Sequence, residues 1–191
     1  MDWKNKFSHC LARPMLVVAL LGAGIGAGAP AALAATQGSL GATSTGSVAI
    51  SASVPARARL SGLNNVTFSS VNPANNASNA QNICAWSNTP TKGYRITASG
   101  SGAGNAFTLS AGALSVPYTV QWHGTSGQTS GTALSAGSQS GGFVSAATHQ
   151  QCSSGPAASA SLIVGITATN LQTMQAATNY TGTLTLLMTP Q

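Results

Sequence analysis

The chain has 191 residues, with seven Lys or Arg against a single Asp or Glu, and a formal net charge of +6. The one acid is Asp2, so the rest of the chain has no carboxylate side chain from which to build a paired-carboxylate hydrolase or a Ser-His-Asp triad. The basic balance reflects missing acids, because only Arg57, Arg59, Lys92 and Arg95 follow the first segment. Nucleic-acid binding, which needs clustered cations, is not expected.

Residues 1–34 have the pattern of a secretory signal peptide. A basic start is followed by the apolar run Met15–Leu21, and Ala32-Leu33-Ala34 predicts cleavage between Ala34 and Ala35. A membrane anchor is the alternative, but the apolar run is short for a bilayer span and soon breaks into glycines and Pro30. We therefore expect export, to the periplasm and then to the cell surface, or secretion.

The next segment, residues 35–54, predicts a flexible leader and one strand. Residues 35–45 are rich in Gly, Ser and Thr, and Gly46–Val54 then alternates with a period of two. One face of this strand carries the larger apolar side chains Val48, Ile50, Ala52 and Val54. Pro55 ends the strand because it has no N–H to give to a ladder. The pattern leaves open whether the partner is the same chain or another.

Residues 55–191 have the length of a single domain, and their apolar residues alternate in short runs separated by turn residues. No segment combines helical periodicity with helical length; Thr169–Gln175 is expected to form one helical turn. Ser69–Gln81 is predicted to be a loop, and Gly124–Gly142 a mobile or surface excursion. We therefore predict an antiparallel β-sandwich. The predicted strands are Ala56–Leu63, Val66–Phe68, Ile83–Trp86, Tyr94–Ser99, Ala106–Ser110, Val116–His123, Thr132–Leu134, Ser161–Ala168 and Thr183–Thr189.

Two cysteines lie beyond the predicted signal peptide, Cys84 and Cys152. An even number in an exported chain predicts one disulfide, with two free buried thiols as the alternative. His123 and His149 could join these cysteines around zinc only if the disulfide were absent. There is no Gly-x-Ser-x-Gly elbow, and Gly100–Asn105 is expected to be a surface turn and not a phosphate loop. We expect neither catalysis nor a cofactor.

Four aromatic residues fall in or beside predicted strands: Trp86, Tyr94, Trp122 and Tyr180. They could line a sugar-binding surface, although aromatics at strand positions more often pack in the core or at its rim.

Four segments along the chain resemble, in order and spacing, one known family. These are Thr45–Ala52, Cys84–Ile96 with its turn and Gly-Tyr strand, Ser110–Val120, and Ala177–Leu186 with its Tyr-Thr pair. The chain resembles the spore coat protein U-like subunits of archaic chaperone–usher pili. Two features depart from that family. A cysteine expected near Ala58 is missing, so the disulfide pairing cannot be carried over, and Gly124–Gly142 replaces a more aromatic stretch.

The resemblance implies a pilin whose immunoglobulin-like sandwich lacks its last strand. A periplasmic chaperone would fill the exposed groove first, and at an outer-membrane usher the N-terminal strand of the next subunit would replace it. Val48, Ile50, Ala52 and Val54 would then be the donor residues. The sequence end at Gln191, directly after an apolar strand, fits this expectation. The expected partners are related pilin subunits, with no small-molecule substrate. The alternatives are an adhesin-like, carbohydrate- or surface-binding sandwich, or a self-contained secreted one.

Overall fold

The computed structural model describes residues 34–191, so the predicted signal peptide lies outside the described residues except for Ala34. The chain divides into two compact units, one ending at Ala52 and the other spanning Ser53–Gln191.

In the described part of the first unit, one antiparallel bridge joins Thr36 to Ser47. Their backbone amides and carbonyls exchange hydrogen bonds of 2.9 and 3.0 Å. Beyond Ser47 the predicted strand Gly46–Val54 has no ladder partner among residues 34–191. Val48 is 72% exposed and Ile50 is 90% exposed. The apolar face predicted for this strand is therefore uncovered in the single chain.

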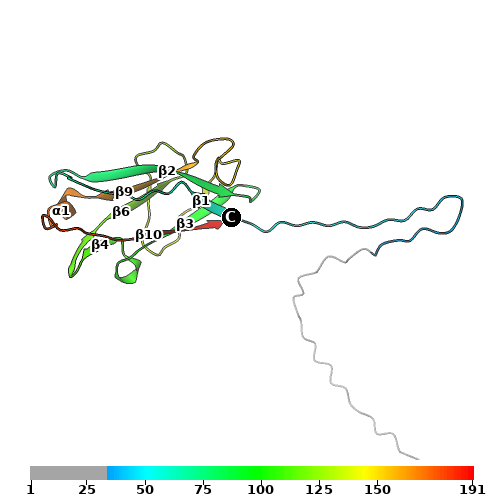
Figure 1. Cartoon of the computed structure of the whole chain (residues 1–191), viewed down its shortest axis with the longest axis horizontal. Coiled ribbons are helices and arrows are strands. Elements are labelled where there is room, and N and C mark those ends of the chain that lie inside the picture. The colour runs from blue at the N-terminus through cyan, green and yellow to red at the C-terminus, as the bar shows by residue number, and fades with distance from the viewer. Residues whose placement is uncertain (1–33) are drawn as a thin grey trace, which may run out of the picture. The chain divides into compact units, whose positions relative to one another are not determined.

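The second unit is an all-β sandwich in which every strand pair is antiparallel, and Figure 1 shows its layers. One sheet has the order β1 (Ala58–Ser61), β2 (Ala77–Ser87), β9 (Ala160–Ile166), β6 (Thr119–His123) and β7 (Thr132–Ala133). The other has the order β10 (Leu184–Pro190), β3 (Gly93–Gly100) and β8 (Phe143–Val144). A separate hairpin pairs β4 (Thr108–Ala111) with β5 (Leu114–Pro117), and the helical turns are η1 (Ala103–Asn105) and α1 (Ala168–Leu171).

Alternation along the strands builds one core between the sheets. Strand β3 contributes Tyr94, Ile96 and Ala98, which are fully buried, and β6 contributes Val120 and Trp122. Because successive side chains point to opposite faces, the polar residues between them lie outside this core. The predicted β-sandwich is therefore confirmed.

Most predicted strand ends shift by one or two residues, as in β1 against the predicted Ala56–Leu63, and two differences are larger. Strand β2 begins at Ala77, inside the predicted loop Ser69–Gln81, because its ladder with β9 extends from Ala77 opposite Ile166 to Ile83 opposite Ala160. This pairing outweighs the low strand propensity of the asparagines there. The predicted strand Val116–His123 is interrupted at Tyr118, where the chain changes partner: β5 pairs with β4, whereas β6 pairs with β9.

The polar stretch Gly124–Gly142 is a structural part of the sandwich. The N–H groups of Gly137 and Ser140 donate to the carbonyls of Ala98 and Ile96, at 2.7 and 2.8 Å. The hydroxyl of Ser140 also accepts the N–H of Ile96. This stretch therefore covers the edge of β3 that β8 leaves unpaired. Most of its residues are exposed, as expected for a surface excursion, although its backbone is tied to β3.

The predicted disulfide between Cys84 and Cys152 is present, with a Cα–Cα distance of 5.9 Å. It packs with Ala147 and Trp86 in a small second cluster beside the main core. Within residues 34–191, no helix has the length and apolar character needed to cross a bilayer.

Candidate functional site: an apolar groove between two unpaired backbone edges

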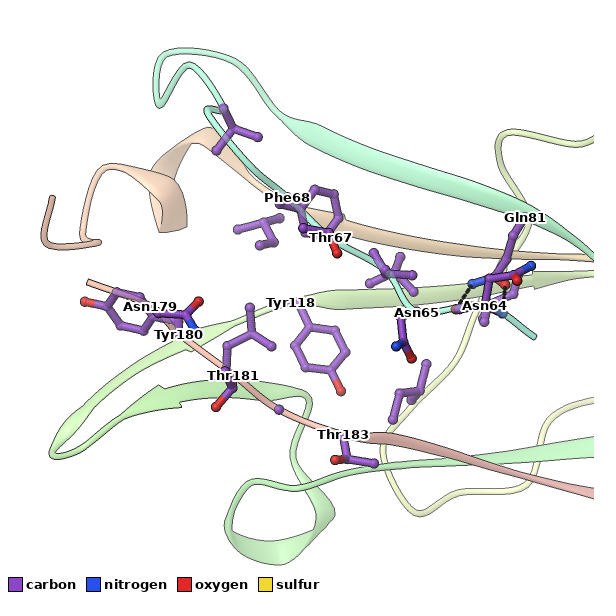
Figure 2. Close-up of a pocket in the computed structure, with 18 of the residues that line it drawn as sticks. Asn64, Asn65, Thr67, Phe68, Gln81, Tyr118, Asn179, Tyr180, Thr181 and Thr183 are labelled. Carbon is purple, nitrogen blue, oxygen red and sulfur yellow. Dashed lines mark hydrogen bonds between the residues drawn. The ribbon is translucent and has the colours of Figure 1, made fainter. Parts of the chain in front are cut away.

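An open groove of about 680 Å³ lies along one side of the sandwich. One wall is the segment 63–71, the opposite wall is residues 178–186, and the floor comes from the core faces of β9 and Tyr118. Figure 2 shows Tyr118 between the two walls, with Asn64, Asn65 and Gln81 toward one end and Asn179 and Tyr180 toward the other. Most side chains that line the middle of the groove are apolar.

The first wall begins where β1 ends. Gly62 has a φ of +82°, a conformation that favours glycine, and the chain leaves the sheet there. The side chain of Gln81 holds the next residue: Asn64 N–H donates to its Oε1 at 2.8 Å, and its Nε2 donates to the Asn64 carbonyl at 3.1 Å. Val66–Phe68, predicted to be a strand, pairs with no strand among the described residues.

The backbone of this wall is open to hydrogen bonding. The N–H and C=O groups of residues 66–71 make no hydrogen bond to another described residue. Val66 and Phe68 still pack partly against the core. Val66–Phe68 is thus anchored by its side chains and unpaired along its backbone, like a strand that lacks a neighbour, until Ser70, with a φ of +53°, turns the chain.

The second wall ends in strand β10, whose described ladder is with β3 alone. Its inward residues Leu184, Leu186 and Met188 are only half-buried, although they pack against the core. Since β8 and the 137–140 segment cover the far edge of β3, the unpaired edge of this sheet is the one that borders the groove. The groove therefore lies between two unpaired edges, one from each wall.

The floor is apolar and well packed. Leu162, Val164 and Ile166 of β9 face the groove, and Leu171 of α1 closes one end. Helix α1 begins after Thr167, whose hydroxyl accepts the N–H of Asn170 at 3.3 Å. Among the described residues, the lining holds no Asp, Glu, His, Cys, Lys or Arg side chain; its polar groups are hydroxyls and amides.

The polar groups around the groove differ in their hydrogen bonding. The hydroxyl of Tyr180 accepts the N–H of Gln175 at 3.1 Å. By contrast, the buried hydroxyl of Tyr118 has no hydrogen-bond partner among the described residues. Burial raises the pKa of Tyr118 above its usual value.

The residues considered for zinc or sugar binding occupy structural positions. The sulfurs of Cys84 and Cys152 are joined in the disulfide. Within residues 34–191, no three His, Cys, Asp or Glu side chains lie close enough together to hold a metal ion. The Nδ1 atoms of His123 and His149 each accept a backbone N–H two residues further on. Tyr94 and Trp122 are fully buried in the core, so they form no exposed sugar platform.

The family resemblance implies an exposed groove, but the sequence does not say which residues line it. The groove brings together residues that are about 120 positions apart, and no local pattern joins segment 63–71 to residues 178–186. One signal was available: Val66–Phe68 alternates like a short strand.

Comparison with protein-family models and with curated proteins finds no match for this chain.

Proposed function

We propose that this protein is a structural subunit of a bacterial surface pilus, in which the groove of one copy receives the strand Gly46–Val54 of the next. The observation that carries the proposal is that one chain combines both halves of such a contact. It has an apolar groove between two unpaired edges, and it has an alternating segment whose apolar face is exposed. This sandwich would be immunoglobulin-like and incomplete until a neighbour supplies the missing strand.

The chemistry of the two halves is complementary. Inserting the segment would bury Val48, Ile50 and Val54, which contribute about 1.5–3 kcal/mol each when fully buried. Its backbone would pair with β10 and with Val66–Phe68, at about 1 kcal/mol for each hydrogen bond. A small apolar ligand could fill the same volume, but it would leave both backbone edges unpaired. An extended peptide would pair with the backbone edges of both walls and cover the apolar floor at the same time.

The open groove also accounts for the expected partners. An uncovered sheet edge beside apolar side chains is an aggregation hazard during export. A periplasmic chaperone that occupies the groove, and an outer-membrane usher at which a subunit strand replaces it, would remove that hazard. In this proposal the protein has no catalytic role, cofactor or small-molecule substrate.

The proposal is tested with the chain starting at Ala35 and two matched variants. Ile50→Asn places a polar side chain on the inserted face, whereas Ser51→Asn makes a similar change on the opposite face. By size-exclusion chromatography with light scattering, we expect the unmodified chain to form concentration-dependent oligomers, Ile50→Asn to abolish them, and Ser51→Asn to retain them. If the unmodified chain stays monomeric at every concentration, or if both variants assemble equally, exchange of this strand between copies is wrong.

A peptide then separates insertion from other modes of association. Thr45–Val54 added to the Ile50→Asn chain should raise its unfolding temperature, because ligand that binds the native state stabilises it. A peptide carrying Ile50→Asn serves as the control and should have no effect. A self-contained sandwich would respond to neither peptide.

A further inference from the structure

The hydroxyl of Tyr118 is an unexplained feature of the groove. The side chain is 7% exposed and lines the cavity, yet its oxygen has no hydrogen-bond partner among the described residues. A buried polar group without a partner destabilises the fold, and such groups are rare in native proteins. This oxygen therefore calls for a partner that arrives when the groove is filled.

The packing of the ring does not require the hydroxyl. The ring of Tyr118 lies against that of Phe107, with centroids 5.6 Å apart and an interplanar angle of 31°. A phenylalanine at this position could make the same contact. The hydroxyl oxygen therefore contributes no hydrogen bond while the groove is empty.

Tyr118 is also held firmly in place. It lies at the break between β5 and β6, where the chain passes from the hairpin to the sheet, and its N–H donates to the Phe107 carbonyl at 2.9 Å. Backbone and ring are thus tied to the same neighbour. Figure 2 shows the ring in the middle of the groove, between Phe68 on one wall and Thr183 on the other. A fixed polar atom at the centre of a binding groove is suited to setting the position of the bound strand.

We propose that the Tyr118 hydroxyl donates a hydrogen bond to a main-chain carbonyl of the inserted strand and thereby fixes its register, with Ala52 opposite Tyr118. This inference rests on the proposed function and names the groove residue that determines which part of the strand sits where.

The choice of Ala52 follows from size. Side chains on one face of a strand recur about every 6.8 Å, so a single donor residue faces Tyr118 in any one register. Of Val48, Ile50, Ala52 and Val54, alanine is the smallest and leaves the hydroxyl free to reach the backbone. A shift by two residues would place valine or isoleucine over the ring and separate the oxygen from the carbonyl. Among the four apolar donor residues, the one small side chain thus matches the bulky, polar residue on the floor.

The test uses the chain from Ala35 carrying Ile50→Asn, at a concentration where it is monomeric, titrated with fluorescently labelled Thr45–Val54. Tyr118→Phe should weaken peptide binding by about fivefold, the effect of losing one hydrogen bond. It should leave the unfolding temperature of the empty chain unchanged or higher, because it removes an unpaired group. Tyr94→Phe is the control outside the groove. It should lower the unfolding temperature, because the Tyr94 hydroxyl already accepts the Trp122 indole N–H, and leave peptide affinity unchanged.

A spectroscopic measurement reports on the hydroxyl directly. With ¹³Cζ-labelled tyrosine the chain gives three signals, for Tyr94, Tyr118 and Tyr180. Saturating peptide should shift the Tyr118 signal, assigned by its loss in Tyr118→Phe, and leave that of Tyr94 in place. If peptide binds equally well to Tyr118→Phe and the Tyr118 signal does not move, the inference is wrong while the proposed function stands. If no peptide binds to the unmodified groove, both fail.

Peptide variants test the register. Ala52→Leu should weaken binding by at least about tenfold, as expected for overpacking, whereas Ser51→Leu, on the opposite face, should be tolerated. Equal affinities for these two peptides would overturn the placement of Ala52 opposite Tyr118.

Discussion

The indole Nε1 of Trp122 donates a hydrogen bond to the hydroxyl of Tyr94 across 3.1 Å, and both side chains are fully buried. Trp122 belongs to β6 in one sheet, and Tyr94 belongs to β3 in the other. Their rings meet edge to face, with centroids 6.3 Å apart. This hydrogen bond links the two layers across their shared core. It also gives a partner to each of the two polar atoms that these large aromatic side chains bring into the core.

Tyr94→Phe should therefore destabilise the protein. It removes the acceptor and leaves a buried indole N–H unpaired, at a cost of about 1–3 kcal/mol. Tyr118→Phe is the control, because its hydroxyl has no partner among the described residues, and it should be neutral or stabilising. Urea unfolding followed by tryptophan fluorescence measures both. If Tyr118→Phe lost more stability than Tyr94→Phe, or if both variants lost the same amount, this view of the core would be wrong.

The sequence predicted these core residues well because they obey local rules. Tyr94, Ile96 and Ala98 alternate within one strand, and the burial they show follows from that period alone. The start of β2 at Ala77 could not be predicted, since its asparagines favour turns and the ladder with β9 comes from residues about 85 positions away. Tertiary pairing decided that boundary.

Loss of the disulfide should cost substantial stability. Cys84 and Cys152 are 68 residues apart, and closing a loop of that length contributes about 4 kcal/mol in the chain-entropy model. The double substitution Cys84→Ala and Cys152→Ala should lower the free energy of unfolding by roughly this amount. Chemical denaturation of both proteins without reductant gives the comparison. A loss below about 1 kcal/mol would show that the unfolded chain gains little freedom when the bridge is removed.

The fold should resist acid. Residues 34–191 contain no Asp or Glu, and protonation of carboxylates that are paired in the native state is the main cause of acid denaturation. We expect the free energy of unfolding of the chain from Ala35 to stay nearly constant between roughly pH 5 and pH 2. Thermal melts across this range test the expectation, and a steep loss would contradict it.

A variant with one carboxylate provides the contrast. Thr167 caps α1 by accepting the Asn170 N–H, and aspartate can do the same as an anion. A carboxylate stabilised in the folded state has a lowered pKa, so its contribution is present above the unfolded pKa and is lost as pH falls through the folded one. Thr167→Asp should therefore acquire an acid dependence that the unmodified chain does not show.

Alkaline pH should destabilise the fold. Burial raises the pKa of Tyr94, with the Trp122 hydrogen bond partly opposing it, and burial also raises the pKa of Tyr118. A raised folded pKa means that stability is complete below the unfolded value of about 10 and is lost as pH rises through the folded value. Unfolding temperature should fall above about pH 10, and Tyr94→Phe should reduce the steepness.

The groove illustrates what a sequence pattern leaves out. Gly46–Val54 was predicted as a strand from its alternation, and that remains a prediction about a partner, because the described chain gives it no ladder. The role of Gly124–Gly142 as a cover for β3 could not be foreseen, since it depends on Ser140 meeting Ile96 across the fold. The unpaired hydroxyl of Tyr118 likewise appears only when its neighbours are known.

Amide hydrogen exchange on the Ile50→Asn chain, with and without the peptide Thr45–Val54, shows whether a strand enters the groove. Saturating peptide should slow exchange in Val66–Phe68 and at the outward amides of β10, by on the order of tenfold or more, and leave other regions unchanged. The peptide with Ile50→Asn should protect neither. Unchanged exchange at both edges, or protection confined to another surface, would show that the groove does not receive this strand.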